Sequence, residues 1–378
     1  MAASTSMMNN VWLGSETGIL KGVNVGKKTA TNYSDLKTLD KEQEISAMCW
    51  ATEEEQMLLT GLRNGTVKTF DLEKGEFTET RDCSGGEGVF RGLATWDDSL
   101  ITCVESGLLK VWKEDTEEQT EINVGANIRK MRQNPVKRNV VATGGMENDM
   151  KVWDLEDPEK PVFRAKNVRN DFLELRVPVC VNDISFIPES SKIVTCTGHH
   201  HLRVYDPSTP RRRPVMSVEF DEYPLMSMSI APGGNSVVVG NTHGKMAHID
   251  LRKGQVLRVY KGFAGSIRSI QCHPTLPLVA SCSLDRFLRI HHIPSGTLEN
   301  KIYLKSRLNC LLFSSASFDT VDTEGGVKAN ERPVGPVDEE AESIWKQMEE
   351  ITEESTQAKR KVNAETKTAV KRKAPPET

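Results

Sequence analysis

The histidines are the residues whose grouping first suggests chemistry. Three stand in a row at His199, His200 and His201, and His243 lies 42 residues after the last of them. Imidazole nitrogens bind zinc, but a stable site needs further ligands at fixed spacing. No cysteine or carboxylate set accompanies these histidines at such spacing, and successive residues of a strand point to opposite faces. We therefore predict exposed turn histidines and no metal site.

The sequence contains none of the short motifs that mark common catalytic sites. It has no Gly-x-Ser-x-Gly, no His-Glu-x-x-His, no Gly-x-x-x-x-Gly-Lys, and no pair of carboxylates with a supporting local pattern. The eight cysteines stand singly, without a Cys-x-x-Cys pair, which is typical of buried thiols in a reducing compartment. We predict a protein that is not an enzyme, with no cofactor and no small-molecule substrate.

The stretch from Val140 to Pro158, VVATGGMENDMKVWDLEDP, indicates the elements that hold the chain together. It contains two short apolar runs joined by a polar turn and closed by the pair Trp153-Asp154. A small residue at Gly144 and a large one nine positions later recur along the chain. The matching pairs are Gly14/Val23, Gly61/Phe70, Cys103/Trp112, Cys196/Tyr205, Gly240/Ile249 and Cys282/His291. Successive first members lie 47, 42, 41, 52, 44 and 42 residues apart, which predicts seven similar β-units.

The innermost strand of each unit is also recognisable. Six such strands are expected at Ile45–Trp50, Phe90–Trp96, Ile128–Gln133, Val181–Ile187, Met226–Ile230 and Ile267–Cys272. The first unit lacks one, whereas Leu308–Ser314 has the pattern of such a strand and no unit follows it. We predict that Leu308–Ser314 completes the first unit and closes a ring, which removes the open sheet edge.

These units resemble the repeats of the WD-repeat family. The resemblance implies an all-β fold, a seven-bladed WD40-type β-propeller over residues 11–315. In that family a blade is often tied by a network of Asp, His, Ser or Thr, and Trp. Here only the seventh blade keeps the aspartate, Asp285 with Ser281, and Phe263 replaces the histidine. We therefore expect apolar packing between blades to carry most of the stability.

Basic residues from three neighbouring blades form a candidate binding face. In the WD-repeat fold one face carries the turns after each innermost strand and the turns before each outermost strand. On that face fall Lys137, Arg138, Lys192, Arg211, Arg212, Arg213, Arg252 and Lys253. Such an arc suits phosphates or acidic protein, because arginine forms paired hydrogen bonds to both. Glu156, Asp157, Glu159 and Glu189 lie nearby, so a mixed, solvated face remains the alternative.

The longest connection in the ring, Lys166–Pro178, is assigned to the opposite face. Long loops on rigid scaffolds often bind partners. A folded flap that covers a blade edge is the other reading of this segment, and the sequence does not separate the two.

The chain changes character at both ends. Residues 1–10 are predicted to be disordered, 316–337 to be a linker, and 357–378 to be a basic tail. Residues 338–356 predict an acidic amphipathic helix within this otherwise disordered tail, which either docks on the propeller or awaits a partner. Its apolar stripe is Ile344, Trp345, Met348 and Ile351.

Charge and targeting signals favour a nuclear protein. Residues 316–378 hold 14 of the 53 acidic and 10 of the 49 basic residues, so the propeller carries 39 of each and is neutral. Any nucleic-acid contact of the propeller must therefore come from a local patch. There is no long apolar run and no secretory signal. Two basic clusters match a two-part nuclear import signal, and their residues are Lys359, Arg360, Lys371, Arg372 and Lys373. A tail that binds nucleic acid is the alternative interpretation.

Taken whole, the chain resembles a family of nucleolar WD-repeat factors that assemble the large ribosomal subunit. The resemblance rests on NNVWLGSETGILKGVNV, TGGMENDMKVWDLEDP, VCVNDISFIP, SCSLDRFLRIHHIPSG and the acidic-then-basic tail. It implies a non-catalytic scaffold in the nucleus and nucleolus that acts in rRNA processing on pre-60S ribosomal particles. Its implied partners are ribosomal proteins, assembly factors, rRNA if it is contacted at all, and an AAA-type ATPase that releases the scaffold. The import signal adds a nuclear import carrier, and no membrane partner is expected.

A second reading is a substrate receptor of a cullin-type ubiquitin ligase. Such WD-repeat proteins resemble this chain at Ile249-Asp250-Leu251-Arg252, where Asp-x-Arg contacts the ligase adaptor. The Trp153-Asp154 unit has Glu156 where the arginine is needed, so the match is single and imperfect.

Overall fold

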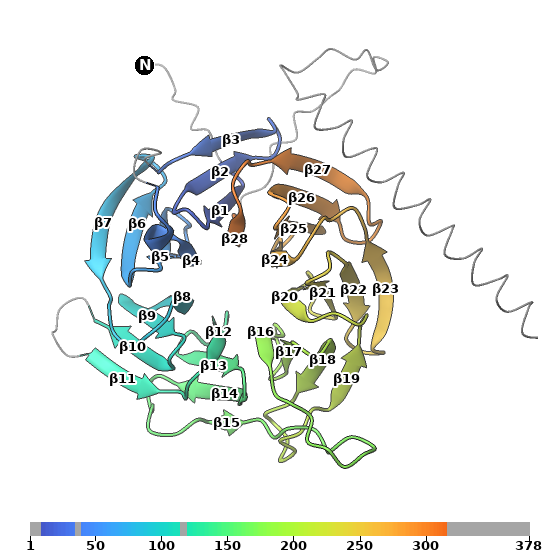
Figure 1. Ribbon diagram of the computed structural model, residues 1–378. Coiled ribbons are helices and arrows are strands. Elements are labelled where there is room, and N and C mark those ends of the chain that lie inside the picture. The colour runs from blue at the N-terminus through green and yellow to red at the C-terminus, as the bar shows by residue number, and fades with distance from the viewer. Residues whose placement is uncertain (1–8, 35–38, 114–118, 316–378) are drawn as a thin grey trace, which may run out of the picture. The chain divides into compact units, whose positions relative to one another are not determined.

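Apolar and β-branched runs form short strands separated by polar turns in the computed structural model, which describes residues 9–34, 39–113 and 119–315. In these residues 28 strands pair into seven four-stranded antiparallel sheets, arranged as blades around a central axis (Figure 1). The predicted seven-bladed β-propeller is confirmed. The one helical element described is a 3₁₀ turn, η1 (Lys41–Gln43), and no described helix has the length and apolar character needed to span a membrane.

Each blade is a meander of four strands that runs from the axis to the rim. The innermost strands of blades 1 to 7 are β28 (Leu308–Phe313), β4 (Ile45–Trp50), β8 (Phe90–Trp96), β12 (Ile128–Gln133), β16 (Val181–Phe186), β20 (Leu225–Ile230) and β24 (Ile267–Cys272). The second strands are β1 (Val11–Ser15), β5 (Met57–Leu62), β9 (Ser99–Val104), β13 (Val140–Gly145), β17 (Ile193–Thr197), β21 (Ser236–Asn241) and β25 (Leu278–Ser283). The third strands are β2 (Leu20–Asn24), β6 (Thr66–Asp71), β10 (Leu108–Trp112), β14 (Asn148–Asp154), β18 (His201–Tyr205), β22 (Met246–Asp250) and β26 (Phe287–His292). The outermost strands are β3 (Thr29–Asn32), β7 (Glu76–Asp82), β11 (Gln119–Asn123), β15 (Phe163–Arg164), β19 (Met216–Glu219), β23 (Gln255–Tyr260) and β27 (Leu298–Tyr303).

Blade 1 is built from both ends of the propeller. Strand β28 pairs antiparallel with β1, with Val11 opposite Phe313 and Gly14 opposite Cys310. The backbone of Phe313 is also tied to both neighbouring blades. Its carbonyl accepts from Trp50 Nε1 at 3.2 Å, and its N–H donates to Gln271 Oε1 at 2.9 Å.

The first strand begins at Val11, and the two residues before it also bond to the first blade. The N–H of Asn10 donates to the carbonyl of Val23 at 2.9 Å, and Asn9 Nδ2 donates to the hydroxyl of Tyr33 at 2.7 Å. The prediction of disorder through residue 10 is therefore wrong for these two asparagines. Their amide groups supply hydrogen bonds that a reading based on apolar patterning does not detect.

The recurring small residue is where one blade meets the next. A Cβ atom at Gly144 would lie 2.9 Å from Val181 Cγ1, and one at Gly240 would lie 2.8 Å from Ile267 Cγ2. Val181 and Ile267 are the first residues of the following blades' innermost strands. Larger side chains at the glycines would push the blades apart, so close packing between blades requires the small residue.

The expected loss of the Asp–His–Ser/Thr–Trp network holds for most blades, with two remnants. In blades 3 and 4 the indole N–H groups of Trp112 and Trp153 donate to Thr102 at 2.9 Å and Thr143 at 3.0 Å. Blade 7 uses a different arrangement. Asp285 pairs with buried Arg289 at 2.7 Å, and the Arg289 guanidinium lies 4.7 Å from the ring centre of Phe263. The phenylalanine that replaces the usual histidine thus contributes a cation–π contact.

Two details of blade 7 differ from the sequence reading. The serine that hydrogen-bonds Asp285 is Ser283 rather than Ser281, whose hydroxyl instead donates to the carbonyl of Arg289 at 3.4 Å. His291 occupies the usual tryptophan position and is 3% exposed. Burial, together with the charge of Arg289, lowers the pKa of His291 to about 4, so the ring is neutral and packs as an apolar group.

A buried carboxylate joins blades 4, 5 and 6 near the axis. Asp183 of β16 is 1% exposed. Arg132 of β12 donates to its two oxygens at 3.2 and 3.3 Å, and the N–H of Met228 in β20 donates at 3.1 Å. Burial alone would raise the pKa of Asp183, but Arg132, Lys130 and these hydrogen bonds outweigh it and lower the pKa. The carboxylate is therefore ionised and links three blades.

Several predicted segments lie outside the described residues. These are most of the N-terminal segment, the linker at 316–337, the amphipathic helix at 338–356 with its stripe, and the basic tail at 357–378 with both import clusters.

The pairing of β28 with β1 generates a prediction about truncation. A chain ending at Lys305 loses β28, which exposes an unpaired edge of β1 and the apolar surface of blade 7, so aggregation and rapid proteolysis are expected. A chain ending at Ala316 keeps β28 and serves as the matched control, with a melting temperature like that of the full chain. Thermal unfolding and limited proteolysis measure both. Equal solubility and thermal stability of the two chains would show that β28 does not close the ring.

Candidate functional site

The eight basic residues singled out in the sequence all lie on turns that emerge at one end of their blades. Lys137 and Arg138 follow β12, Lys192 precedes β17, Arg211–Arg213 precede β19, and Arg252 and Lys253 precede β23. Since successive strands of a blade alternate in direction, these turns share one face of the ring. Their side chains, however, have different roles.

Arg138, Arg212 and Arg213 bond to other parts of the protein. A fourth arginine, Arg252, pairs with the last residue of its own blade's third strand. Arg138 Nη2 donates to the hydroxyl of Thr95 at 2.8 Å, and its Nη1 pairs with Glu53 at 3.2 Å. Arg252 pairs with Asp250 at 3.3 Å while its side chain stays 68% exposed. Lys137, Lys192, Arg211 and Lys253 are exposed. Arg138 and Arg213 are partly buried, so the exposed basic groups are fewer than the predicted eight.

Arg212 and Arg213 hold the long connection between blades 4 and 5. Arg212 Nε donates to the carbonyl of Arg164 at 2.8 Å, and Arg213 Nε donates to the carbonyl of Asn167 at 3.2 Å. In return, the N–H of Lys166 donates to the carbonyl of Arg212 at 2.8 Å. The arginine run and the loop at 166–178, which the sequence assigned to opposite faces, therefore meet at the rim. We call this combination the blade 4–5 junction.

The loop of the blade 4–5 junction has internal hydrogen bonds of its own. Asp171 Oδ1 accepts from the N–H groups of Leu173 and Leu175, both at 2.9 Å, and the N–H of Asp171 donates to the carbonyl of Leu175 at 3.0 Å. At its base, Asn167 Nδ2 donates to the carbonyl of Val177 at 2.6 Å, and Arg176 pairs with Glu147 at 2.9 Å. The segment is thus a folded, hairpin-like loop with hydrogen bonds of its own.

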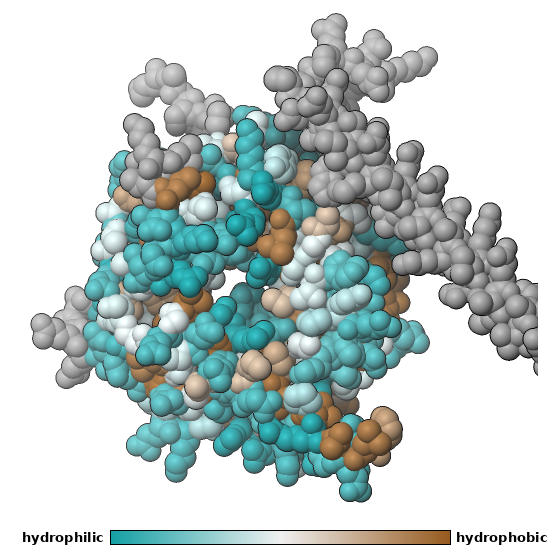
Figure 2. All heavy atoms as spheres, viewed as in Figure 1, coloured by the Kyte–Doolittle hydropathy of each residue, from teal (hydrophilic) through white to brown (hydrophobic). Residues whose placement is uncertain are grey.

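The tip of this loop exposes large apolar side chains. Phe172 is 92% exposed, Leu173 62% and Leu175 60%. Figure 2 shows an apolar patch at the lower right, over the connection between β15 and β16, surrounded by polar residues. The sequence analysis singled out the loop but not its apolar tip. The pattern Phe-Leu-Glu-Leu directly after an Asn-Asp turn could have predicted exposed apolar side chains there.

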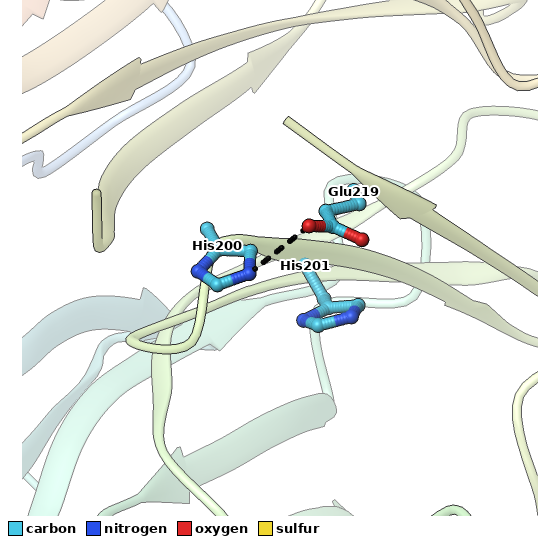
Figure 3. Close-up of side chains that lie close together, drawn as sticks. All are labelled: His200, His201 and Glu219. Carbon is cyan, nitrogen blue, oxygen red and sulfur yellow. Dashed lines mark ion pairs between the residues drawn. The ribbon is translucent and has the colours of Figure 1, made fainter. Parts of the chain in front are cut away.

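The histidine row does form a cluster, for a reason that strand alternation does not predict. His200 has a left-handed backbone with φ of 50°, which places its ring against that of His201 with centroids 5.0 Å apart. Figure 3 shows His200 and Glu219 facing one another beside His201, and His200 Nε2 lies 3.3 Å from Glu219 Oε1. The ligand atoms of these three residues lie within 4.8 Å of one another.

Each ring of the histidine cluster has a contact within the protein. His201 Nδ1 contacts the carbonyl of His199, and His200 Nε2 pairs with Glu219, so one nitrogen of each ring has a partner. His243 stacks instead on Tyr223 at 4.2 Å.

The cysteines are suited to packing rather than to reaction. All eight are free thiols. Burial raises the pKa of Cys49, Cys103, Cys272 and Cys310 to about 12. A thiol that stays protonated at neutral pH is a poor nucleophile and a poor metal ligand. The prediction of buried structural thiols holds for five cysteines, whereas three are only partly buried: Cys49, Cys180 and Cys310.

Comparison with known proteins shows which family shares this sequence and its repeats. The family model for the WD domain, G-beta repeat, matches residues 254–292, which contain the outermost strand of blade 6 (β23) and the three inner strands of blade 7 (β24 to β26). The chain is 51% identical over 356 residues to WD repeat-containing protein 74 of Bos taurus and to that of Homo sapiens, covering 92% of this chain and 92% of each relative. It is 27% identical over 296 residues to ribosome biogenesis protein NSA1 of Meyerozyma guilliermondii, covering 66% of this chain and 74% of that protein. Since half of the residues are shared over nearly the whole chain, and the repeat units form a closed propeller, the protein belongs to the WD repeat-containing protein 74 family.

Proposed function

We propose that the chain is a non-catalytic scaffold in ribosome biogenesis that binds precursors of the large ribosomal subunit. The observation that carries the proposal is the match over 92% of the chain to WD repeat-containing protein 74, together with relatives named as ribosome biogenesis proteins. The geometry supports a scaffold. The propeller is a rigid ring, and the blade 4–5 junction presents charged and apolar groups at its rim.

The finer parts of this proposal concern place and partners. The scaffold acts in the nucleolus during rRNA processing on pre-60S particles, and an AAA-type ATPase releases it. A nuclear import carrier binds the two basic clusters of the tail. Ribosomal proteins and assembly factors are its direct neighbours on the particle, and no catalytic step is assigned to it.

Affinity purification tests the proposed function. A tagged full-length chain is expected to co-purify and co-sediment with large-subunit precursor RNA and ribosomal proteins. If the chain is instead a substrate receptor of a ubiquitin ligase, a cullin and its adaptor should co-purify. In that case Arg252→Ala should abolish co-purification of the adaptor, because Asp250 and Arg252 would contact it. Recovery of cullin components without ribosomal precursors would replace the proposed function.

The exposed part of the basic face generates a second prediction. We expect Lys192→Ala, Arg211→Ala and Lys253→Ala together to leave the free energy of unfolding within about 0.5 kcal/mol, because these side chains are exposed. If they contact phosphates, binding to purified precursors weakens and its salt dependence flattens by roughly one unit of slope for each lost contact. If they contact acidic protein, binding weakens and the loss is the same after nuclease treatment.

Co-sedimentation over a salt series measures this effect. Lys27→Ala with Lys28→Ala is the matched control, since both lysines are exposed on the turn between β2 and β3 at the same end of another blade. Wild-type retention of the triple variant at every salt concentration would remove this face from the docking surface.

The import signal generates a third prediction. Changing Lys359, Arg360, Lys371, Arg372 and Lys373 to alanine is expected to shift the tagged protein toward the cytoplasm, because an import carrier recognises the two charge clusters together. Lys328→Ala with Lys346→Ala, elsewhere in the tail, is the control. Fluorescence microscopy gives the nuclear fraction, and an unchanged fraction would assign import to another part of the chain.

A further inference from the structure

Three large apolar side chains stand in water at the tip of the blade 4–5 junction, where ordinary folding would bury them. Burying a leucine or phenylalanine side chain stabilises a protein by about 1.5–3 kcal/mol. Phe172, Leu173 and Leu175 forgo most of that gain, with Phe172 92% exposed. Single exposed apolar residues need no explanation, but three within four positions, ringed by polar groups, mark an interaction site.

The tip does not depend on apolar contacts for its shape. Asp171 Oδ1 accepts two backbone hydrogen bonds, from Leu173 and Leu175 at 2.9 Å each, and Asn170 Nδ2 donates to the carbonyl of Glu174 at 2.8 Å. Glu174 adopts the left-handed conformation that the turn needs, with φ of 60°. Polar groups thus fix the backbone and leave the apolar side chains pointing outward, so little conformational entropy remains to be lost on binding.

The base of the loop is fixed to two blades. Arg213 of blade 5 bonds the carbonyl of Asn167 at 3.2 Å, and Glu147 of blade 4 pairs with Arg176 at 2.9 Å. Glu147 Oε1 also accepts from the N–H of Val179 at 3.1 Å. These contacts hold the tip in one position relative to the ring.

The charges at the base of the loop are mainly positive, whereas the tip itself carries Asp171 and Glu174. The loop and the groups that hold its base contain six basic residues, Lys166, Arg169, Arg176, Arg211, Arg212 and Arg213, and three acidic ones, Glu147, Asp171 and Glu174. Glu147 and Arg176 form an ion pair, so five basic and two acidic residues remain and the base of the loop keeps an excess of positive charge. An acidic rim around a pocket that receives the tip would face these basic groups at the base of the loop and complement their charge.

We propose that Phe172, Leu173 and Leu175 form a preformed knob that inserts into an apolar pocket with an acidic rim on a protein partner. A protein is favoured over RNA because two of the three side chains are branched aliphatic groups, which cannot stack on bases as aromatic rings do. The proposal rests on the proposed function for the identity of the particle that supplies the partner. The knob itself follows from exposure, hydrogen bonding and charge.

Photo-crosslinking tests the proposal in cells that make the full chain. A photoreactive benzoylphenylalanine replaces Phe172, and adducts are mapped by mass spectrometry. The expected result is an adduct on one protein, at a segment with both apolar and acidic residues, that disappears with Leu173→Ser and Leu175→Ser. The same photoreactive group at Val136 is the control. The proposal would be overturned by an adduct on RNA, by an adduct on lipid, or by adducts on many proteins like those formed from position 136.

A binding measurement supplies the second arm. We expect Phe172→Ser, Leu173→Ser and Leu175→Ser together to weaken retention on purified large-subunit precursors by at least about tenfold, as for a small group of apolar hot-spot residues. Asp171→Ala keeps the three apolar side chains and removes the turn bonds, so it should weaken retention to a smaller degree. Val136→Ser with Val162→Ser is the control, because these valines are 72% and 70% exposed elsewhere on blade 4.

The two arms separate the knob from the proposed function. If the wild-type chain fails to sediment with precursors, the proposed function falls, and the crosslink at position 172 still decides the knob. If the wild-type chain sediments and the triple serine variant does so equally well, with unchanged melting temperature, the knob is wrong and the proposed function stands.

Discussion

The pairing of β28 with β1 is the constraint on which the propeller depends. A stack of four-stranded sheets leaves an exposed blade surface at each end unless the last sheet packs against the first. In this chain the two ends meet within one sheet, because β28 supplies the innermost strand of blade 1. Phe313 then bonds Trp50 of blade 2 and Gln271 of blade 7, so the shared blade is fixed on both sides. The closure thus connects blade 7 to blade 2 through a blade that is made from both ends of the propeller.

Most of the ring could be predicted from the sequence because its signals are local and repeated. The sequence repeats a small residue that is followed nine positions later by a large one. The structure explains the small residue, because Gly144 lies close to Val181 of the next blade. The closing strand was predictable as well, since an innermost strand was missing at one end of the chain and left over at the other. The end of each blade from which a basic turn emerges follows directly from the strand order.

The candidate site was harder to predict because its bonds connect distant residues. Arg212 and Arg213 read as exposed charges between prolines, yet their guanidinium groups donate to carbonyls 48 and 46 residues earlier in the chain. Backbone carbonyls carry no sequence signal, so no pattern could show these acceptors. His200 is a similar case. Strand alternation separates it from His201, but a left-handed backbone at His200 brings the two rings together.

The blade 4–5 junction is also the place where the ring is best able to support a docking surface. Asp183 lies in β16, the innermost strand of blade 5. Its carboxylate accepts hydrogen bonds from Arg132 of blade 4 and from the N–H of Met228 in blade 6. Away from the axis, Arg213, which precedes β19, and Glu147, in the turn between β13 and β14, anchor the loop. An exposed loop binds tightly only if its support does not move when the partner is engaged. Because blades 4 and 5 are joined at the axis and both contact the base of the loop, the knob is supported by two blades rather than by a single turn.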